Sequence, residues 1–155
     1  MTSAMTTPPP GTPRREDLMS ALIAVRHNIE VAHRLWLLPG KCEQIHGHSM
    51  WVRLELTGEL DRGGLLDGLD FGAVKRAYRE HLDTKYDHRL LLDVDDPLAS
   101  VGAVKLPGLR PTGGQPTTEN IARWIAEWSQ ERFPCAKGGR VTVHETHVNE
   151  AAWSW

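Results

Sequence analysis

The sequence predicts one α+β domain, in which an antiparallel sheet of four strands packs against two helices. The chain has 155 residues, a typical size for a single domain. Two segments with the alternation of a β-strand come first, two with helical spacing follow, and two strand-like segments close the chain. Strands that are neighbours in sequence, with helices grouped between the two pairs, are typical of an antiparallel α+β fold.

The composition argues against several classes of partner. The formal net charge is −2, so nothing in the overall charge indicates nucleic acid or an anionic membrane surface. No apolar run approaches the length that spans a bilayer, and the start of the chain lacks the pattern of a secretory signal. Two cysteines, Cys42 and Cys135, imply no disulfide framework. We therefore expect a cytoplasmic protein with neither nucleic-acid nor membrane partners.

The domain is expected to span residues 21–155, after a disordered tail over residues 1–20. Residues 6–13 of that tail are Thr, Pro and Gly, which offer no apolar face to bury.

Two strands are predicted in the first third of the domain, over residues 21–33 and 50–59, because apolar and polar side chains alternate in both. His33 lies at the end of the apolar face of the first strand. His46 and His48 share the parity of the apolar residues in the second. An antiparallel hairpin would bring the two ends together, and with them the three imidazoles.

The first helix is predicted over residues 71–84, where apolar residues recur at helical spacing after Asp70, a suitable N-cap. The second follows the capping threonines Thr117 and Thr118 and ends near Phe133. Between the helices, residues 93–115 are rich in Pro, Gly and Asp and are expected to form a long loop, either a lid or a mobile excursion.

The end of the chain is predicted to supply the second pair of strands. Residues 137–139 are expected to turn, and residues 140–146 alternate as a third strand. The last residues, to Trp155, are expected to form a fourth.

His33, His46 and His48 form a candidate zinc site. Three nitrogen ligands with a fourth position left open are typical of catalytic zinc. If Cys42 were a fourth ligand, the site would be closed and structural. Spacing alone leaves both arrangements open, and both keep the metal.

Two further features suggest chemistry. Asp87 and His88 are adjacent, so the carboxylate could orient the imidazole as an acid/base, although the pair taken alone is better explained as a helix-end histidine beside a solvated aspartate. Glu145 shares the parity of apolar residues in its strand, and a buried carboxylate needs a partner. That partner could be the adjacent N–H groups of a pterin or guanine, or a basic side chain, unless the strand end is solvated.

Together these features resemble the 6-pyruvoyl-tetrahydropterin synthase and 6-carboxytetrahydropterin synthase family. The motifs that carry the resemblance are Ala32-His33-Arg34-Leu35, Cys42 through His48, Asp87-His88, and Pro116-Thr117-Thr118-Glu119-Asn120 with His144-Glu145-Thr146. The resemblance implies the tunnelling fold, a four-stranded antiparallel sheet with two helices that assembles into barrel-forming homohexamers with active sites between subunits.

The resemblance also implies roles for individual residues. Zinc would bind His33, His46 and His48. The catalytic groups would be Cys42, Asp87 and His88. The pterin would be held by Glu145, with help from Thr117 and Thr118.

The spacing of Cys42 distinguishes branches of the family. Three residues separate it from His46-Gly47-His48, as in the carboxytetrahydropterin synthases of 7-deazapurine (queuosine-type) biosynthesis, whereas the pyruvoyl enzymes place five there. The implied activity is a zinc-dependent lyase acting on 7,8-dihydroneopterin triphosphate. The alternatives are the pyruvoyl product and a non-catalytic module with structural zinc. Arg34 and Lys41 are candidates for triphosphate contacts, or form a solvated basic face.

Overall fold

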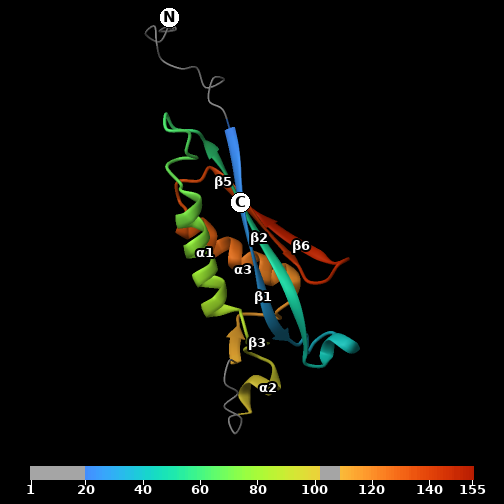
Figure 1. The fold of residues 1–155 in the computed structure, drawn as a ribbon. Coiled ribbons are helices and arrows are strands. Elements are labelled where there is room, and N and C mark those ends of the chain that lie inside the picture. The colour runs from blue at the N-terminus through green and yellow to red at the C-terminus, as the bar shows by residue number, and fades with distance from the viewer. Residues whose placement is uncertain (1–19, 102–108) are drawn as a thin grey trace, which may run out of the picture.

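The structure is a computed structural model that describes residues 20–101 and 109–155 as one mixed sheet with helices packed against it (Figure 1). The six strands are β1 (Ser20–His33), β2 (His46–Glu59), β3 (Arg89–Asp93), β4 (Leu109–Thr112), β5 (Gly138–His144) and β6 (Glu150–Ser154). The helices are α1 (Phe71–Lys85), α2 (Pro97–Ser100) and α3 (Thr118–Arg132), with a short 3-10 turn, η2 (Lys41–Glu43). The strand order is β4-β3-β1-β2-β5-β6.

The β1–β2 hairpin forms the centre of the sheet. Each strand has 14 residues, and the two pair in antiparallel register along their whole length, from Ser20 opposite Glu59 to His33 opposite His46. The predicted hairpin is therefore confirmed, and β2 extends to the two histidines that the sequence placed just before the strand. The antiparallel strands β5 and β6 continue the sheet beyond β2, which confirms the last two strands.

The prediction of four antiparallel strands is wrong in its count and in one half of the sheet. Strands β3 and β4 extend the sheet beyond β1, and both are parallel to their neighbours. They have five and four residues, too short for alternation to stand out in the sequence. Leu91 and Leu92 are both buried in β3, so the strand is a continuous apolar run rather than an alternating one.

The predicted loop over residues 93–115 is likewise not a loop throughout. It contains the single-turn helix α2 and strand β4, while residues 102–108 lie outside the described part of the chain. The predicted two helices thus become three. The predicted tail also lies outside the described residues, apart from Ser20, which opens β1.

Helices α1 and α3 pack against one face of the sheet and form the hydrophobic core with it. Asp70 caps α1 by accepting a hydrogen bond from Ala73 N, and Thr117 caps α3 by accepting one from Asn120 N, as the sequence predicted. The fully buried side chains Tyr78 and Leu82 of α1 and Ile121 and Ile125 of α3 pack with the apolar face of β1, β2 and β5. No helix in the described residues is long and apolar enough to cross a membrane.

The boundaries of β5 differ from those predicted. The strand begins at Gly138, where a turn was expected, because Gly138 and Gly139 pair with Thr57 and Leu56 of β2. It ends at His144, so Glu145 belongs to the turn that leads into β6.

Candidate metal and substrate site

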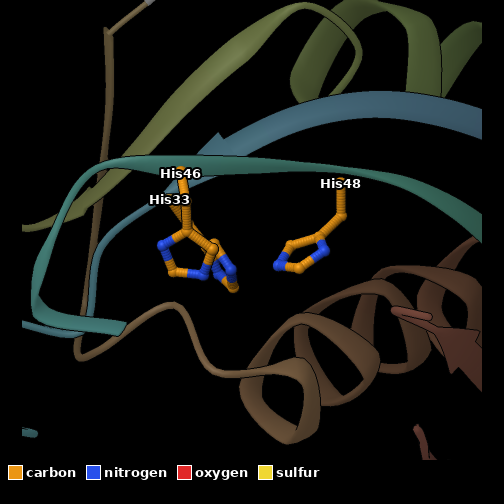
Figure 2. A group of neighbouring side chains, drawn as sticks. All are labelled: His33, His46 and His48. Carbon is orange, nitrogen blue, oxygen red and sulfur yellow. The ribbon is translucent and has the colours of Figure 1, made fainter. Parts of the chain in front are cut away.

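Three imidazoles meet where the β1–β2 hairpin opens. His33 ends β1, and His46 and His48 begin β2; the cross-strand pairs are His33 with His46 and Val31 with His48. Figure 2 shows the three rings on the same side of the two strands. One possible ligand atom from each lies within 4.8 Å of the others, so the group could hold a metal ion. Cys42 does not belong to this cluster.

Backbone carbonyls orient two of the rings. The Nδ1 of His33 lies 2.7 Å from the carbonyl oxygen of Pro116, and the Nδ1 of His46 lies 2.8 Å from that of Gln44. A carbonyl only accepts, so each Nδ1 carries the proton and each Nε2 keeps its lone pair free for a metal. The Nε2 atoms of His33 and His48 are buried without a hydrogen-bond partner, which suits a metal ligand.

His33 is the most enclosed of the three, with 1 % of its side chain exposed. Its burial lowers the pKa of the imidazole, and the nearby His46 and His48 lower it further, against the hydrogen bond to Pro116 and the charge of Glu145, which raise it. A lowered pKa favours the neutral ring, the form that binds metal.

Cys42 lies on residues 34–45, which connect β1 to β2 and which we call the arm. It sits in η2, half-buried, and its carbonyl accepts a hydrogen bond from Leu35 N at 2.8 Å. Cys42, the three histidines and Glu145 line one cavity of about 630 Å³. The structure thus brings the thiol of Cys42, predicted to be catalytic, into the same cavity as the three histidines.

Glu145 sits beside the imidazoles rather than in a strand. Its Oε1 accepts a hydrogen bond from Thr118 Oγ1 at 2.7 Å and lies 3.7 Å from His33 Nε2 and 4.0 Å from His48 Nε2. The side chain is 19 % exposed, so the carboxylate is partly solvated, and in the described residues no Arg or Lys forms the ion pair that was one of the alternatives from sequence. It faces the cavity with a hydroxyl as its partner.

The two threonines have different places. The hydroxyl of Thr117 accepts from Asn120 N at 3.2 Å as the cap of α3, whereas that of Thr118 reaches across to Glu145. Both line the cavity, as does Lys41. Arg34 does not; its Nε lies 3.4 Å from Asp96 Oδ2.

Asp87 and His88 form a pair outside this cavity. His88 Nδ1 lies 2.7 Å from Asp87 Oδ2, and the other carboxylate oxygen accepts from Glu30 N at 2.8 Å. Burial by itself raises the pKa of Asp87, but these two hydrogen bonds, together with the nearby charges of His88 and His27, hold that pKa below its usual value. The carboxylate therefore stays charged and fixes the orientation of the imidazole.

The backbone of His88 has an unusual conformation. Its φ of 53° is in the left-handed region that few non-glycine residues adopt, and its N–H is bound to Glu30 O. Its side chain is 79 % exposed and lines a second cavity with Gly47, Ser49 and His48, the last of which also lines the cavity of Cys42. Within one chain, the structure therefore does not bring Asp87 and His88 into the cavity that holds Cys42.

Some residues of the site were not predicted from the sequence. No residue-type signal identifies the carbonyls of Pro116 and Gln44 as partners of His33 and His46. Asn149, from the turn after β5, and Glu119 also line the cavity. Glu119 lay within a quoted motif, whereas Asn149 gave no signal.

Comparison with known proteins is consistent with this site. The family model described as 6-pyruvoyl tetrahydropterin synthase matches residues 22–154, and the chain belongs to that family of enzymes. A 6-carboxy-5,6,7,8-tetrahydropterin synthase of Haemophilus influenzae is 30% identical over 109 residues, which cover 66% of this chain and 77% of the relative. A dihydroneopterin monophosphate aldolase of Pyrococcus furiosus is 28% identical over 116 residues, 75% of this chain and 81% of the relative.

The fold is also shared with solved structures. The 6-pyruvoyl tetrahydropterin synthase of Plasmodium falciparum superimposes with a TM-score of 0.68 at 18% identity, covering 88% of this chain and 98% of that one.

Proposed function

We propose that the protein is a zinc-dependent 6-carboxy-5,6,7,8-tetrahydropterin synthase. It converts 7,8-dihydroneopterin triphosphate and water to 6-carboxytetrahydropterin, acetaldehyde and triphosphate, in a pathway of 7-deazapurine biosynthesis. The observation that carries this proposal is the single cavity in which three metal-competent imidazoles, the Cys42 thiol and the Glu145 carboxylate converge. The named relatives and the spacing of Cys42 before His46 support the carboxy product.

The three imidazoles fit zinc, since the Nε2 atoms of His33 and His48 are buried without a hydrogen-bond partner and the Nδ1 atoms of His33 and His46 are bound to carbonyls. Zinc held there supplies Lewis-acid polarisation of the hydroxyl oxygens of the substrate side chain. Cys42 moves protons on that side chain. Glu145 holds the pterin ring by accepting from its ring N–H and exocyclic amine, beside Thr117 and Thr118.

Asp87 and His88 complete the site from a second copy of the chain. The pair is preorganised, and His88 is solvent-exposed and faces a different cavity from Cys42. A neighbouring subunit of a homohexamer would bring the pair to Cys42, so that the imidazole, oriented by Asp87, exchanges protons with the substrate.

A second function deserves a test because the Pyrococcus furiosus relative is named as an aldolase. The deciding experiment is mass analysis of the products after zinc-loaded protein has been incubated with 7,8-dihydroneopterin triphosphate. 6-Carboxytetrahydropterin with acetaldehyde supports the proposal. A pyruvoyl product, a hydroxymethyl pterin from aldol cleavage, or unchanged substrate would overturn it.

Cys42→Ala distinguishes an enzyme from a structural zinc module. We expect the variant to keep its zinc and fold but to lose turnover, because the thiol is outside the three-histidine cluster. Loss of both zinc and fold would instead indicate a closed four-ligand site.

A further inference from the structure

The arm that carries Cys42 is weakly anchored by apolar packing. Three of its apolar side chains are about half exposed: Leu37 at 59%, Leu38 at 50% and Ile45 at 49%. Of the remaining apolar side chains, Leu35 is buried and Trp36 is half-buried. The position of the thiol therefore depends strongly on the polar contacts that join the arm to the rest of the molecule.

Two such contacts come from the connection between β3 and α3. Leu37 N donates a hydrogen bond of 3.0 Å to Gln115 Oε1, next to the start of α3. Arg34 Nε lies 3.4 Å from Asp96 Oδ2, at the start of α2. The carboxylate of Asp96 is fully buried and the side chain of Arg34 is 18% exposed, so this ion pair is shielded from solvent and less screened than a surface pair.

Gln115 is itself held firmly from the other side. Its carbonyl oxygen accepts hydrogen bonds from Thr117 N and from Asn120 Nδ2, both at 2.8 Å, which fasten it to the first turn of α3. The next residue, Pro116, provides the carbonyl that orients His33. The same short segment therefore contacts both the metal site and the arm, through different groups.

We propose that Gln115 and Asp96 are positioning residues, which fix the arm and thereby set the Cys42 thiol against the three-histidine site. The inference rests on the proposed function only for the catalytic role of Cys42. A proton-transferring group is effective only within hydrogen-bond reach of its target, and a displacement of about 1 Å can cost about a hundredfold in rate. Neither Gln115 nor Asp96 needs to contact the substrate for this role.

The test compares Gln115→Leu with Gln115→Glu, both in a Cys135→Ser background so that Cys42 is the remaining thiol. Leucine removes the acceptor for Leu37 N, whereas glutamate keeps it. Because the carbonyl of Gln115 remains bound to α3 in both, the metal site is left intact. Thr112→Val is the matched control: its hydroxyl bonds Leu92 O and Gly114 O in the same connection but does not touch the arm.

Three measurements report on the arm: hydrogen–deuterium exchange over residues 35–45, the rate of Cys42 alkylation by iodoacetamide as a function of pH, and kcat and KM. In Gln115→Leu we expect faster exchange in the arm, at least about a threefold change in alkylation rate, and a kcat lowered about tenfold with KM nearly unchanged. Zinc content should stay at the wild-type value. Gln115→Glu should restore protection of the arm.

Asp96→Asn provides a second, independent variant. Asparagine still caps α2 but removes the charge that faces Arg34, so exchange and alkylation should change in the same direction. Wild-type exchange and alkylation in both Gln115→Leu and Asp96→Asn would overturn the inference, as would equal changes in Thr112→Val. Altered thiol reactivity without any pterin turnover, even in the wild type, would support the positioning role while refuting the proposed function.

Discussion

At the scale of single residues, the metal site depends on which nitrogen of each ring is free. Pro116 and Gln44 bind the Nδ1 atoms of His33 and His46, so their Nε2 atoms face the shared space. We expect His33→Ala, His46→Ala and His48→Ala each to weaken zinc binding by at least about a hundredfold, because two ligands do not hold zinc tightly. Competition with a chromogenic chelator measures this affinity.

The control for that series is His147→Ala, which removes an exposed histidine that is not in the three-histidine cluster and should leave zinc binding unchanged. Full zinc affinity in any one of the three ligand variants would contradict the assignment.

Glu145 provides a second prediction at this scale. Its Oε1 already accepts from Thr118, and a pterin would add two N–H donors to the same carboxylate. Glu145→Gln turns one acceptor into a donor that faces a donor, so binding of a simple pterin should weaken at least about tenfold, roughly 1.4 kcal/mol. Isothermal titration with a pterin that lacks the triphosphate isolates this contact.

Glu119→Gln is the matched control for Glu145, since Glu119 is another carboxylate that lines the cavity. If Glu119→Gln loses affinity while Glu145→Gln keeps it, the anchor of the pterin is Glu119.

At the scale of elements, the contact between α1 and α3 contains a histidine, His81, whose surroundings disfavour its charged form. His81 stacks on Trp128 with ring centroids 3.8 Å apart, and its Nε2 is buried without a partner. Burial, and then the positive charges of Arg110 and Lys85, lower the pKa of His81 to about 4. The unfolded chain therefore takes up this proton at a higher pH than the folded protein does.

This difference in pKa between the folded and unfolded states sets the direction in which stability changes with pH. The contribution of His81 to stability is fully present above about pH 6.5 and is lost as the pH falls from there toward about 4. We expect His81→Phe, which keeps a ring against Trp128 but cannot titrate, to lose less stability than the wild type between pH 7 and pH 5. Urea unfolding at both values measures this, with His147→Phe as the control. Equal losses in His81→Phe and the wild type would refute the role of His81.

At the scale of the whole molecule, the residues proposed to be catalytic lie in two different places on one chain. Cys42 lines the cavity of the three histidines, whereas His88, which is bound to Asp87, lines another. The sheet has unpaired outer edges at β4 and β6, and Trp51 and Trp153 are half exposed. A closed ring of subunits would pair these edges and cover these side chains. We expect sedimentation measurements to show a homohexamer.

A complementation experiment tests the shared site more directly. Cys42→Ala and His88→Ala should each be inactive, but equal mixtures, dissociated and reassembled together, should regain about a quarter of wild-type activity if each site draws on two subunits. Cys42→Ala mixed with His48→Ala is the control, because both residues come from the same side of the site. A fully active monomer would contradict the expectation.

The sequence by itself determined the central hairpin, the two long helices with their caps, and the three-histidine cluster. These features repeat over many residues or depend on neighbouring positions, so periodicity and parity reveal them. The family also followed from motifs that are local in sequence. Parity placed His33, His46 and His48 on the apolar faces of two adjacent strands, because side chains in a strand alternate between its faces, whereas the register that sets His33 opposite His46 came from the structure.

The tertiary structure alone decided the rest. Strands β3 and β4 are too short to show a period, and their parallel pairing depends on where the crossover through α1 returns the chain. The carbonyl of Pro116 reaches His33 from 83 positions away, and Gln115 reaches Leu37 from 78. A contact through a backbone atom, or between distant polar side chains, leaves no trace in residue type or spacing, because only the packed chain sets which such groups meet.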